Sequence, residues 1–579
     1  MLRVRQVSLP LDDALTLDEA LLRVLSAMAL GVPAKQVRSA RLHKRSVDAR
    51  DKTNVRFVLT VDVSLAGGEP AEQKAAGNHA PNRVAFLPGG TSSGARLSTE
   101  GGAVFNRMQA EHPEPHPMDD PKRKPGNGTG RNSASRHSSA PPPLVVGAGP
   151  AGLFCALTLA RRGLRPILIE RGQPVEQRQI DVEAFETQGR LNPESNVLFG
   201  EGGAGAFSDG KLTCGLNHPL ISTILHILVS CGAPEDILIA QKPHIGTDLL
   251  RKALVQFRQK LIALGVDLRF GHCLTGLRLQ AGRVTAAFVT HENREDMLET
   301  DTAYLAIGHS ARDTYAWLHG LGMPMQAKPF AVGVRIEHLQ SEINKAQYGR
   351  SWPHPALPPA EYKLNVPTPD GRGAYTFCMC PGGRVVGAMH EPGTLNVNGM
   401  SLHARDGPNA NAALLVGVRP ADCGSGGPLA GLDFQRRMEE AAYTLTGCSA
   451  APCQRTEDFL QNTSSKSFGD VLPSFRPGVI AGDVSLCLPD FVTANIRYAL
   501  PRLNRLLKGF DHPDALLTGP ETRSSSPVRL LRNERRESPI SGLFPIGEGA
   551  GYAGGIISAA LDGMTAALGP EQEDIDRAN

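Results

Sequence analysis

The first 65 residues alternate apolar and polar positions in a way that predicts strands on both sides of a helix. Leu2 to Leu9 alternates as a strand with one buried face does, and Val55 to Val63 places an apolar side chain at every second position. Leu17 to Leu30 instead repeats its leucines at helical spacing, and a further strand separates it from Val55. This order predicts a small α+β domain over residues 1–65.

Basic residues gather between the helix and the last strand of this domain. They can form an anion-binding face, or they can protect a solvated strand edge, since charges at an edge discourage pairing with another chain. Edge protection is the simpler interpretation for the residues concerned, which are Arg38, Arg41, His43, Lys44, Arg45 and Arg50.

The regular patterns stop after residue 65. Residues 66–143 hold 11 Pro and 11 Gly in 78 positions, and Phe86 and Phe105 are their only aromatic residues. Such a segment has too little apolar surface to offset the entropy that it would lose on ordering. The composition therefore predicts a disordered linker or insertion over residues 66–142.

Periodic apolar stretches resume at Leu144 and continue to about Ala567, with the strand and helix patterns typical of an α/β fold. We expect a three-layer Rossmann-like domain that is built from residues 143–329 and 516–568. An α+β substrate or cap domain is expected as an insertion over residues 330–515. Residues 569–579 are expected to form a tail.

Residues 144–172 contain a dinucleotide-binding fingerprint in its full context. A short apolar strand leads into Gly147-x-Gly149-x-x-Gly152, a helix follows, and a second apolar strand ends at Glu170. The first glycine permits a tight turn, the second lets the backbone approach a pyrophosphate, and the third lets helix and strand pack closely. The pyrophosphate then lies at the helix N-terminus, and Glu170 is placed to bind the adenosine ribose. The pattern predicts dinucleotide binding but does not separate NAD from FAD.

A motif near the C-terminus indicates which of the two cofactors, NAD or FAD, the chain binds. Residues 542–567 run from an apolar strand through a glycine-rich turn with Glu548 into a helix of small residues. This arrangement resembles the C-terminal flavin motif of two-domain FAD enzymes of the glutathione-reductase type, in which the acid binds a hydroxyl of the cofactor and the helix N-terminus faces the flavin. A positive helix end there would stabilise the anionic reduced flavin. A glycine-rich capping loop is the alternative, but together with the upstream fingerprint the motif favours FAD.

Further strings extend the resemblance over most of the chain. Tyr304 to Tyr315 is similar to the strand that closes the FAD domain in the same superfamily, and Asn196 to Leu212 supplies a second glycine cluster that can lie against the cofactor. The chain resembles the FAD-dependent dehydrogenases of bacteria and plastids, a family mostly known by sequence, which implies a flavoprotein fold and a redox activity. The strings that carry this resemblance are SVDAR at 46–50, KPHIGTD at 242–248, FAVGVRIEH at 330–338, FCMCPGG at 377–383 and ETRSSSPVR at 521–529.

These motifs together predict the residues that bind the FAD cofactor. They are Gly147, Gly149, Pro150, Ala151, Gly152, Glu170, Arg171, Gly202, Gly203, Ala204, Gly205, Gly308, Gly547, Glu548, Gly549, Gly554, Gly555 and Ile556.

Composition and charge exclude several classes of protein. Lys and Arg total 61 against 58 Asp and Glu, so the net charge implies no nucleic-acid partner. No apolar run approaches the roughly 18 to 20 residues that span a bilayer, and the acidic residues near the start argue against a transit peptide. The ten cysteines lack the CxxC spacing of zinc sites, so they are interpreted as reduced thiols and no metal is predicted. We expect a soluble protein of a reducing compartment, either the cytoplasm or the plastid stroma.

A few residues are candidates for chemistry beside the flavin. His309, Arg312 and Asp313 follow the closing strand and can face the cofactor. A structural ion pair of Arg312 with Asp313, or a structural role beside the cofactor adenylate, is an equally compatible interpretation. Cys378 and Cys380 are two residues apart, which in a regular strand puts both thiols on one face, where they could act as a redox pair or a thiolate. Packing as small apolar side chains is the alternative for both cysteines. Further candidates for proton transfer or substrate anchoring, each with a structural alternative, are Arg335, His338 and His390.

Two further GxGxxG strings, at 200–205 and 549–554, belong to the second glycine cluster and to the C-terminal motif already described, so they do not indicate a separate nicotinamide domain. The one CxxxxC, from Cys448 to Cys453, lies about 300 residues after the fingerprint helix, so no reductase disulfide beside the flavin is expected. The electrons must then come from the substrate, from a partner, or from a reductant that binds without its own Rossmann unit. We expect an FAD-dependent oxidoreductase that transfers hydride between flavin and a small organic substrate or partner. Two alternatives stay open, a non-catalytic or regulatory flavoprotein whose basic N-terminal domain docks a partner, and a flavin monooxygenase.

Overall fold

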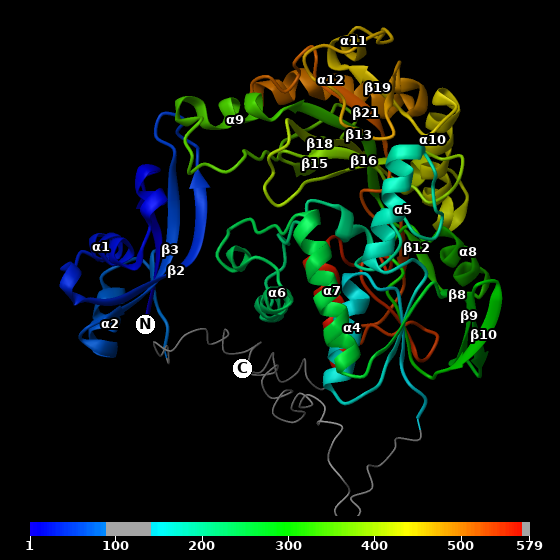
Figure 1. Ribbon diagram of the computed structural model, residues 1–579, viewed down its shortest axis with the longest axis horizontal. Helices are drawn as coiled ribbons and strands as arrows, with labels where there is room; N and C mark the ends of the chain where they lie inside the picture. Colours follow the sequence, from blue (N-terminus) through cyan, green and yellow to red (C-terminus); the bar gives the residue numbers. More distant parts are fainter. Residues whose placement is uncertain (89–139, 570–579) are drawn as a thin grey trace, which may run out of the picture.

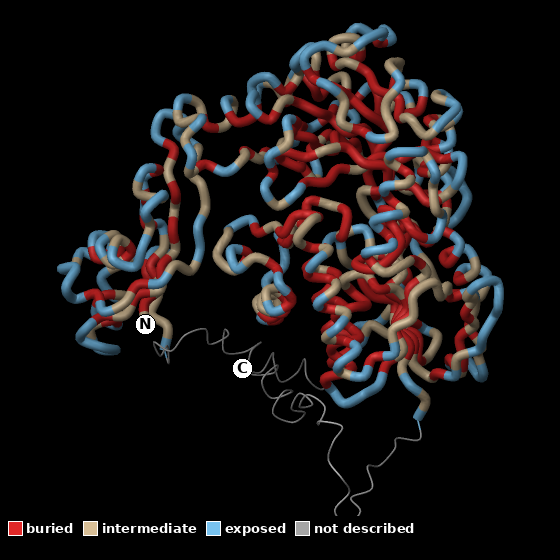
Figure 2. The backbone as a smooth tube through the Cα atoms, in the orientation of Figure 1, coloured by how far each residue is buried: buried red, intermediate tan, exposed pale blue. Residues whose placement is uncertain are grey.

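The computed structural model describes residues 1–88 and 140–569. In Figure 1 a small N-terminal domain (blue) lies beside a larger body. Within the body, a parallel sheet with its helices occupies the lower part of the view, and a large, mainly antiparallel sheet occupies the upper part. Figure 2 shows that buried residues (red) concentrate in the strands of both sheets.

The N-terminal domain is a four-stranded antiparallel sheet with two helices packed on one face. The order along the sheet is β2-β3-β1-β4. The apolar positions of the last alternating strand are buried as its pattern predicted, namely Val55, Phe57, Leu59, Val61 and Val63. The elements of the domain are β1 (Leu2–Leu9), α1 (Glu19–Leu30), β2 (Val37–Asp48), β3 (Arg56–Leu65), α2 (Gly68–Gly77) and β4 (Val84–Phe86).

This domain ends later than its sequence pattern indicated. The prediction of a linker from residue 66 onward is wrong for the first part, because α2 packs on β3, and β4 pairs with β1 so that Val84 lies opposite Val4. Average composition over a long window hides a helix and an edge strand that bury only a few apolar residues each. Most of the rest of the predicted linker, residues 89–139, and nearly all of the predicted tail, residues 570–579, lie outside the described residues.

The basic strand β2 lies at the edge of this sheet. Part of its edge is paired with the body, since the Arg45 N–H donates to Ile239 O at 2.8 Å and the Gln241 N–H donates to Arg45 O at 3.0 Å. Lys52, between β2 and β3, donates to Ala346 O at 2.6 Å. Asp12 Oδ1 also lies 3.0 Å from His354 Nε2, so the N-terminal domain contacts the body through several segments.

Five parallel strands form the central layer of the lower part of the body, in the order β23-β11-β5-β6-β7. Because successive side chains of a strand point to opposite faces, Val145 and Leu168 pack against helices, whereas Val146 and Ile169 pack against a three-stranded sheet. The predicted three-layer Rossmann-like α/β fold is confirmed.

The central strands are β5 (Leu144–Val146), β6 (Ile167–Glu170), β7 (Asp267–Phe270), β11 (Ala303–Leu305) and β23 (Leu543–Pro545). The helices of this part are α4 (Pro150–Arg161), α5 (Val175–Gln188), α6 (Leu220–Ser230), α7 (Thr247–Ala263), α8 (Arg312–Gly320) and α13 (Ile556–Leu568). The third layer consists of β8 (Cys273–Gln280), β9 (Arg283–His291) and β10 (Arg294–Glu299).

The upper part of the body, the cap, is built on a seven-stranded sheet in the order β14-β15-β18-β13-β21-β19-β20. Its strands are β13 (Phe330–Leu339), β14 (Asn365–Val366), β15 (Ala374–Cys380), β18 (Asn409–Val418), β19 (Ala451–Arg455), β20 (Val479–Ala481) and β21 (Leu516–Glu521). Its helices are α9 (Gln340–Tyr348), α10 (Ala430–Thr446), α11 (Thr456–Leu460) and α12 (Asp490–Leu506). Two short strand pairs complete the body, β16 (Arg384–Gly387) with β17 (Val397–Met400) and β12 (Met325–Ala327) with β22 (Val528–Leu530).

The predicted end of the cap at residue 515 is wrong by one strand. β21 pairs with β13 inside the cap sheet, and the chain returns to the parallel sheet only at β23. An apolar stretch specifies a strand, but the sheet that it joins depends on pairing partners elsewhere in the chain.

Candidate functional site

The fingerprint glycines lie between β5 and α4, and each has different surroundings. Gly147 has a φ of +100°, and a Cβ there would lie 2.4 Å from Ala306 O. A Cβ on Gly152 would lie 1.8 Å from Gly147 O, so α4 packs too closely for a side chain. Gly149 lines a cavity, and its Cβ would meet nothing nearer than Gly203 Cα at 3.8 Å. The open side of Gly149 is therefore the space through which phosphate groups can approach the first turn of α4.

This cavity has a volume of about 370 Å³ and is lined by both parts of the body. It brings together the fingerprint, the second glycine cluster and the C-terminal motif. Most of the predicted cofactor-binding residues line it, namely Gly147, Gly149, Pro150, Ala151, Glu170, Arg171, Gly203, Ala204, Gly205, Gly308, Glu548, Gly554, Gly555 and Ile556.

The remaining predicted residues lie behind the cavity wall. At each of them an added Cβ would lie within 2.7 Å of a neighbouring atom, so these positions allow close packing of the backbone. The sequence motif does not distinguish these packing glycines, Gly152, Gly202, Gly547 and Gly549, from the glycines that face the cavity.

Glu170 ends β6 and is buried in the cavity wall. Its Oε2 accepts a hydrogen bond from the Ala148 N–H at 2.7 Å, and its Oε1 accepts from the N–H groups of Gly172 and Gly200 at 2.9 and 3.0 Å. The carboxylate therefore joins β6 to the fingerprint turn and to the second glycine cluster. A carboxylate has further lone pairs, so the predicted hydrogen bonds to a ribose are compatible with these contacts.

The C-terminal motif brings an acid and a helix N-terminus to the cavity. Glu548 Oε1 lies 3.2 Å from His309 Nδ1, and His309 Nε2 lies 3.1 Å from Arg523 O. α13 begins at Ile556 after Gly555, which has a φ of +123° and where a Cβ would meet nothing within 4 Å. The N-termini of α4 and α13 thus both line the cavity and offer N–H groups to negative charge.

The candidate catalytic residues divide into two groups. His309 and Cys378 line the cavity, whereas Arg312 and Cys380 do not, and Cys380 is fully buried. All the cysteines are free thiols. Within residues 1–88 and 140–569, no group of three or more His, Cys, Asp or Glu side chains is arranged to hold a metal ion.

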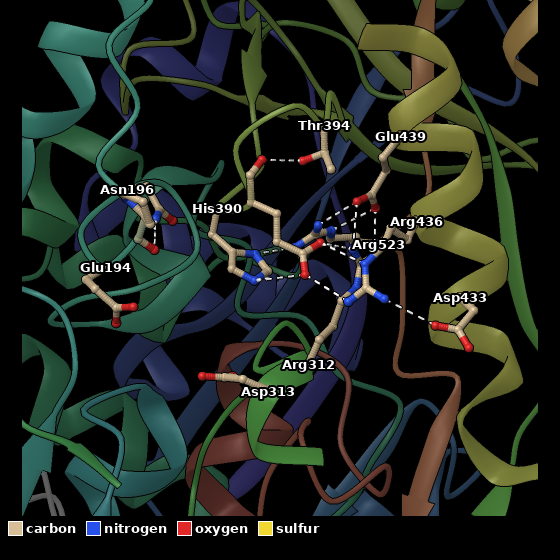
Figure 3. Close-up of polar contacts among 12 residues, drawn as sticks. Glu194, Asn196, Arg312, Asp313, His390, Thr394, Asp433, Arg436, Glu439 and Arg523 are labelled. Atoms are coloured by element: carbon tan, nitrogen blue, oxygen red, sulfur yellow. Dashed lines mark hydrogen bonds and ion pairs between the residues drawn. The ribbon is translucent and has the colours of Figure 1, made fainter. Parts of the chain in front are cut away.

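Arg312 belongs to a buried ion cluster, so the expectation that it faces the cofactor is wrong. It donates to Glu439 at 2.9 Å and to Glu391 at 2.5 Å. Glu439 lies between Arg312 and Arg523, from which it accepts at 2.9 and 2.6 Å (Figure 3). His390 also belongs to this cluster, with its Nδ1 2.9 Å from Arg523 Nη1, and burial lowers its pKa well below the ordinary value.

The other candidates on β13 are buried and lie outside the cavity wall. Arg335 Nη2 donates to Glu521 at 3.0 Å, and its Nη1 donates to Cys378 O at 2.9 Å. His338 Nε2 lies 2.8 Å from Phe510 O, and burial lowers the pKa of this histidine to about 4. Both residues therefore connect segments of the cap, and Arg335 does so through the backbone oxygen of Cys378, which lines the cavity.

The cap side of the cavity contains charged side chains that sequence reasoning did not single out. Lys211 lines the cavity, pairs with Asp209 at 2.8 Å and donates to Met379 O. Asp209 is fully buried and is also held by Arg405, whose Nε lies 3.0 Å from Oδ1. Glu521 lines the same wall, and burial raises its pKa to about 7. A signal for part of this group was present in DGKL at 209–212, where an acid and a lysine directly follow the second glycine cluster.

Comparisons with known proteins agree with this geometry. Residues 143–180 match a family model described as FAD binding domain, residues 329–524 match one described as FAD-dependent protein, C-terminal domain-like, and residues 1–64 match a domain of unknown function. An uncharacterised protein of Clostridium beijerinckii is 47% identical over 428 residues, which are 73% of this chain and 80% of that protein. The chain belongs to this family of FAD-dependent proteins. The cofactor of this chain is FAD. The open side of Gly149 and the N-termini of α4 and α13 at the cavity fit the pyrophosphate of FAD.

The chain is also similar to several solved flavoprotein structures. A flavin-dependent brominase is 11% identical, with 76% of this chain and 80% of that chain covered and a TM-score of 0.33. The myxobacterial chondrochloren halogenase is 12% identical, with 74% and 73% covered and a TM-score of 0.34. A geranylgeranyl bacteriochlorophyll reductase-like protein of Thermoplasma acidophilum is 14% identical, with 76% and 79% covered and a TM-score of 0.32. Among the helices of residues 1–88 and 140–569, none is long and apolar enough to cross a membrane.

Proposed function

We propose that this protein is an FAD-dependent oxidoreductase, a dehydrogenase or reductase that transfers hydride between its flavin and a small organic substrate or electron partner. The observation that carries the proposal is one cavity whose wall combines the cofactor motifs with titratable side chains from the cap. FAD, when bound, supplies a carrier that accepts or gives up hydride. The side chains of the cavity must then bind the substrate and move a proton.

Glu521 is the side chain best placed to move a proton. It lines the cavity, and burial raises its pKa to about 7, so it can take up or release a proton near neutral pH. Lys211 lines the same wall with its ammonium held by Asp209, which supports a role in binding an anionic or carbonyl oxygen of a substrate. Phe377, with 45% of its surface exposed, adds an aromatic face to this wall.

An anaerobic stopped-flow screen of the FAD-loaded protein against NADH, NADPH and a metabolite panel tests the proposal. We expect one reactant to bleach the flavin much faster than the rest, and we expect Glu521→Gln to slow that bleaching while the FAD content stays near that of the wild type. Dithionite serves as the control that the flavin can be reduced.

Other outcomes of the same screen would favour the alternatives. Fast reaction of the reduced protein with oxygen to give a hydroxylated product would indicate a flavin monooxygenase. Bound FAD that no reactant bleaches, together with partner binding that weakens with salt, would indicate a regulatory flavoprotein that uses its basic N-terminal domain.

A further inference from the structure

Cys378 occupies an irregular position in β15, at the cap side of the cavity. Phe377 pairs with Ala413 and Cys380 pairs with Asn411, so β15 holds one residue more than its partner strand over this stretch. Cys378 itself has a φ of +42°, a conformation that costs free energy in any residue other than glycine. The expectation of regular alternation through the two cysteines is therefore wrong, because a bulge interrupts it, although the two thiols still lie close enough to share a hydrogen bond.

The bulge changes the direction of the side chains around it. Cys378 lies in the cavity wall and is only partly buried, whereas Met379 packs in the hydrophobic core and Cys380 is fully buried. Bulges of this kind occur beside active sites, where they aim one side chain out of the regular pattern. The strain thus falls on a residue that lines the cavity.

The charged groups around Cys378 come from several segments. Lys211 reaches Met379 O, next to Cys378, and Arg335 donates to the backbone oxygen of Cys378 at 2.9 Å. The two nearby carboxylates are each paired, Asp209 with Lys211 and Arg405, and Glu521 with Arg335.

These surroundings favour the ionised form of Cys378. A hydrogen bond with the Cys380 thiol lowers the pKa of Cys378 to about 6, against the effect of burial and with help from Lys211 and Arg335. Burial raises the pKa of Glu521 to about 7, so this carboxyl can hold the proton that Cys378 releases. The site can thus contain a thiolate near neutral pH without an additional counter-ion.

We propose that Cys378 is a catalytic thiolate of the FAD site, positioned by Lys211, and that it adds to a substrate with an electrophilic carbon such as that of a carbonyl group. The inference rests on the oxidoreductase function proposed above and names the group that holds its substrate. In the addition, the sulfur supplies the electron pair of the new sulfur–carbon bond. The carbon–oxygen double bond becomes a single bond, and its oxygen takes a proton from the ammonium of Lys211.

The absorption spectrum of the resting, oxidised FAD-loaded protein provides the first test. A thiolate beside oxidised flavin gives a charge-transfer band on the long-wavelength side of the flavin bands. We expect this band in the wild type and its loss as the pH falls through about 6, the pKa of Cys378. Cys378→Ser should abolish the band, and Lys211→Met should move its loss to higher pH, whereas Lys211→Arg should restore the wild-type titration.

Cys273 offers a matched control, because it is another cysteine of the cavity wall and burial raises its pKa to about 11. Cys273→Ser should leave the charge-transfer band in place. The second test is alkylation of the FAD-loaded protein by iodoacetamide, in which the sulfur–carbon bond forms and iodide leaves. Peptide mass spectrometry should find Cys378 modified about tenfold or more faster than Cys273 at about pH 7, with a rate that hardly rises up to about pH 9.

The failure of this inference is distinguishable from the failure of the oxidoreductase proposal. If the flavin spectrum of Cys378→Ser superimposes on that of the wild type, or if Cys378 is alkylated no faster than Cys273, the thiolate assignment is overturned even when a substrate bleaches the flavin. Conversely, the charge-transfer band needs no turnover, so it appears in the resting protein whichever reactant proves to be the substrate.

Discussion

At the scale of single residues, glycines of one motif have separate roles. Gly152 is where α4 contacts the turn after β5, since its Cβ would lie 1.8 Å from Gly147 O. Gly149, three residues earlier, has open space beside it in the wall of the FAD cavity. Close packing therefore explains Gly152, and the approach of a cofactor phosphate explains Gly149.

Substitution with valine should separate these roles. We expect Gly149→Val to abolish FAD binding while it lowers the free energy of unfolding of the apo protein by no more than about 1 kcal/mol, because the branched side chain fills cofactor space and disturbs only the helix cap. Gly152→Val should lower that free energy by about 3 kcal/mol or more, since it forces α4 away from the strand. Denaturant unfolding of both apo proteins and calorimetric titration with FAD measure the two effects. Wild-type FAD affinity in Gly149→Val would contradict the assignment of this cavity to FAD.

At the scale of elements, α13 connects the structural core with the cofactor cavity. All its residues except Ser558 are buried, which explains why the C-terminal motif continues into a helix of small and apolar residues rather than an amphipathic one. Its N-terminus lines the cavity, and its Asp562 accepts from the Gly547 N–H at 2.7 Å and pairs with Arg532 at 2.8 Å. A single helix thus fixes the loop that presents Glu548.

The close crossing of α13 and α4 gives a second prediction. A Cβ on Gly563 would lie 2.0 Å from Ala151 O, so Gly563→Val should push the two helices apart at the cavity end of α4. We expect a loss of at least about 1 to 3 kcal/mol in the free energy of unfolding and a reduced FAD content. Gly320→Ala is the control, because a Cβ there meets nothing within 4 Å. Thermal unfolding and the flavin absorbance of the purified proteins check both variants, and wild-type values for Gly563→Val would show that the helices can adjust.

At the scale of the whole molecule, the buried ion cluster joins the FAD domain to the cap. Arg312 comes from α8, Glu439 from α10, and Arg523 from the segment after β21 (Figure 3). Burial alone would raise the pKa of Glu439, but the guanidinium groups of Arg523 and Arg312 outweigh it and hold this pKa well below its usual range. A group whose pKa is depressed by folding stabilises the folded state above its unfolded pKa and loses that contribution as the pH falls.

Glu439→Gln should therefore destabilise the protein in a pH-dependent way. We expect a loss of about 3 to 5 kcal/mol near neutral pH, because two buried guanidinium groups lose their counter-charge. The difference from the wild type should shrink below about pH 4, where an unfolded glutamate also binds its proton. Asp433→Asn on the same helix is the control, since Asp433 is 60% exposed and pairs with Arg436 at 3.2 Å, a contact worth about 0.2 to 1 kcal/mol. Denaturant unfolding from neutral to acidic pH measures both differences, and a loss in Glu439→Gln that is equal at every pH would contradict this assignment.

The sequence by itself determined those features that depend on local backbone geometry. The spacing of Gly147, Gly149 and Gly152 between a strand and a helix sufficed for the dinucleotide fold, because each glycine answers a constraint within a few residues of itself. The alternation of Val55 to Val63 sufficed for a half-buried strand for the same reason. The prediction of FAD rather than NAD depended on two such local motifs in one chain, the fingerprint at 144–172 and the C-terminal motif at 542–567.

Only the tertiary structure decided which distant segments meet. β21 joined the cap sheet, and Arg312 found its counter-charge on α10, because pairing and burial depend on residues more than a hundred positions away. The same holds for Cys378, whose exposure to the cavity follows from a bulge against β18 and whose charged surroundings come from Lys211, Arg335 and Glu521. Local patterns specify the element that a residue belongs to, whereas the partners of a buried charge or a reactive thiol exist only once the chain has folded.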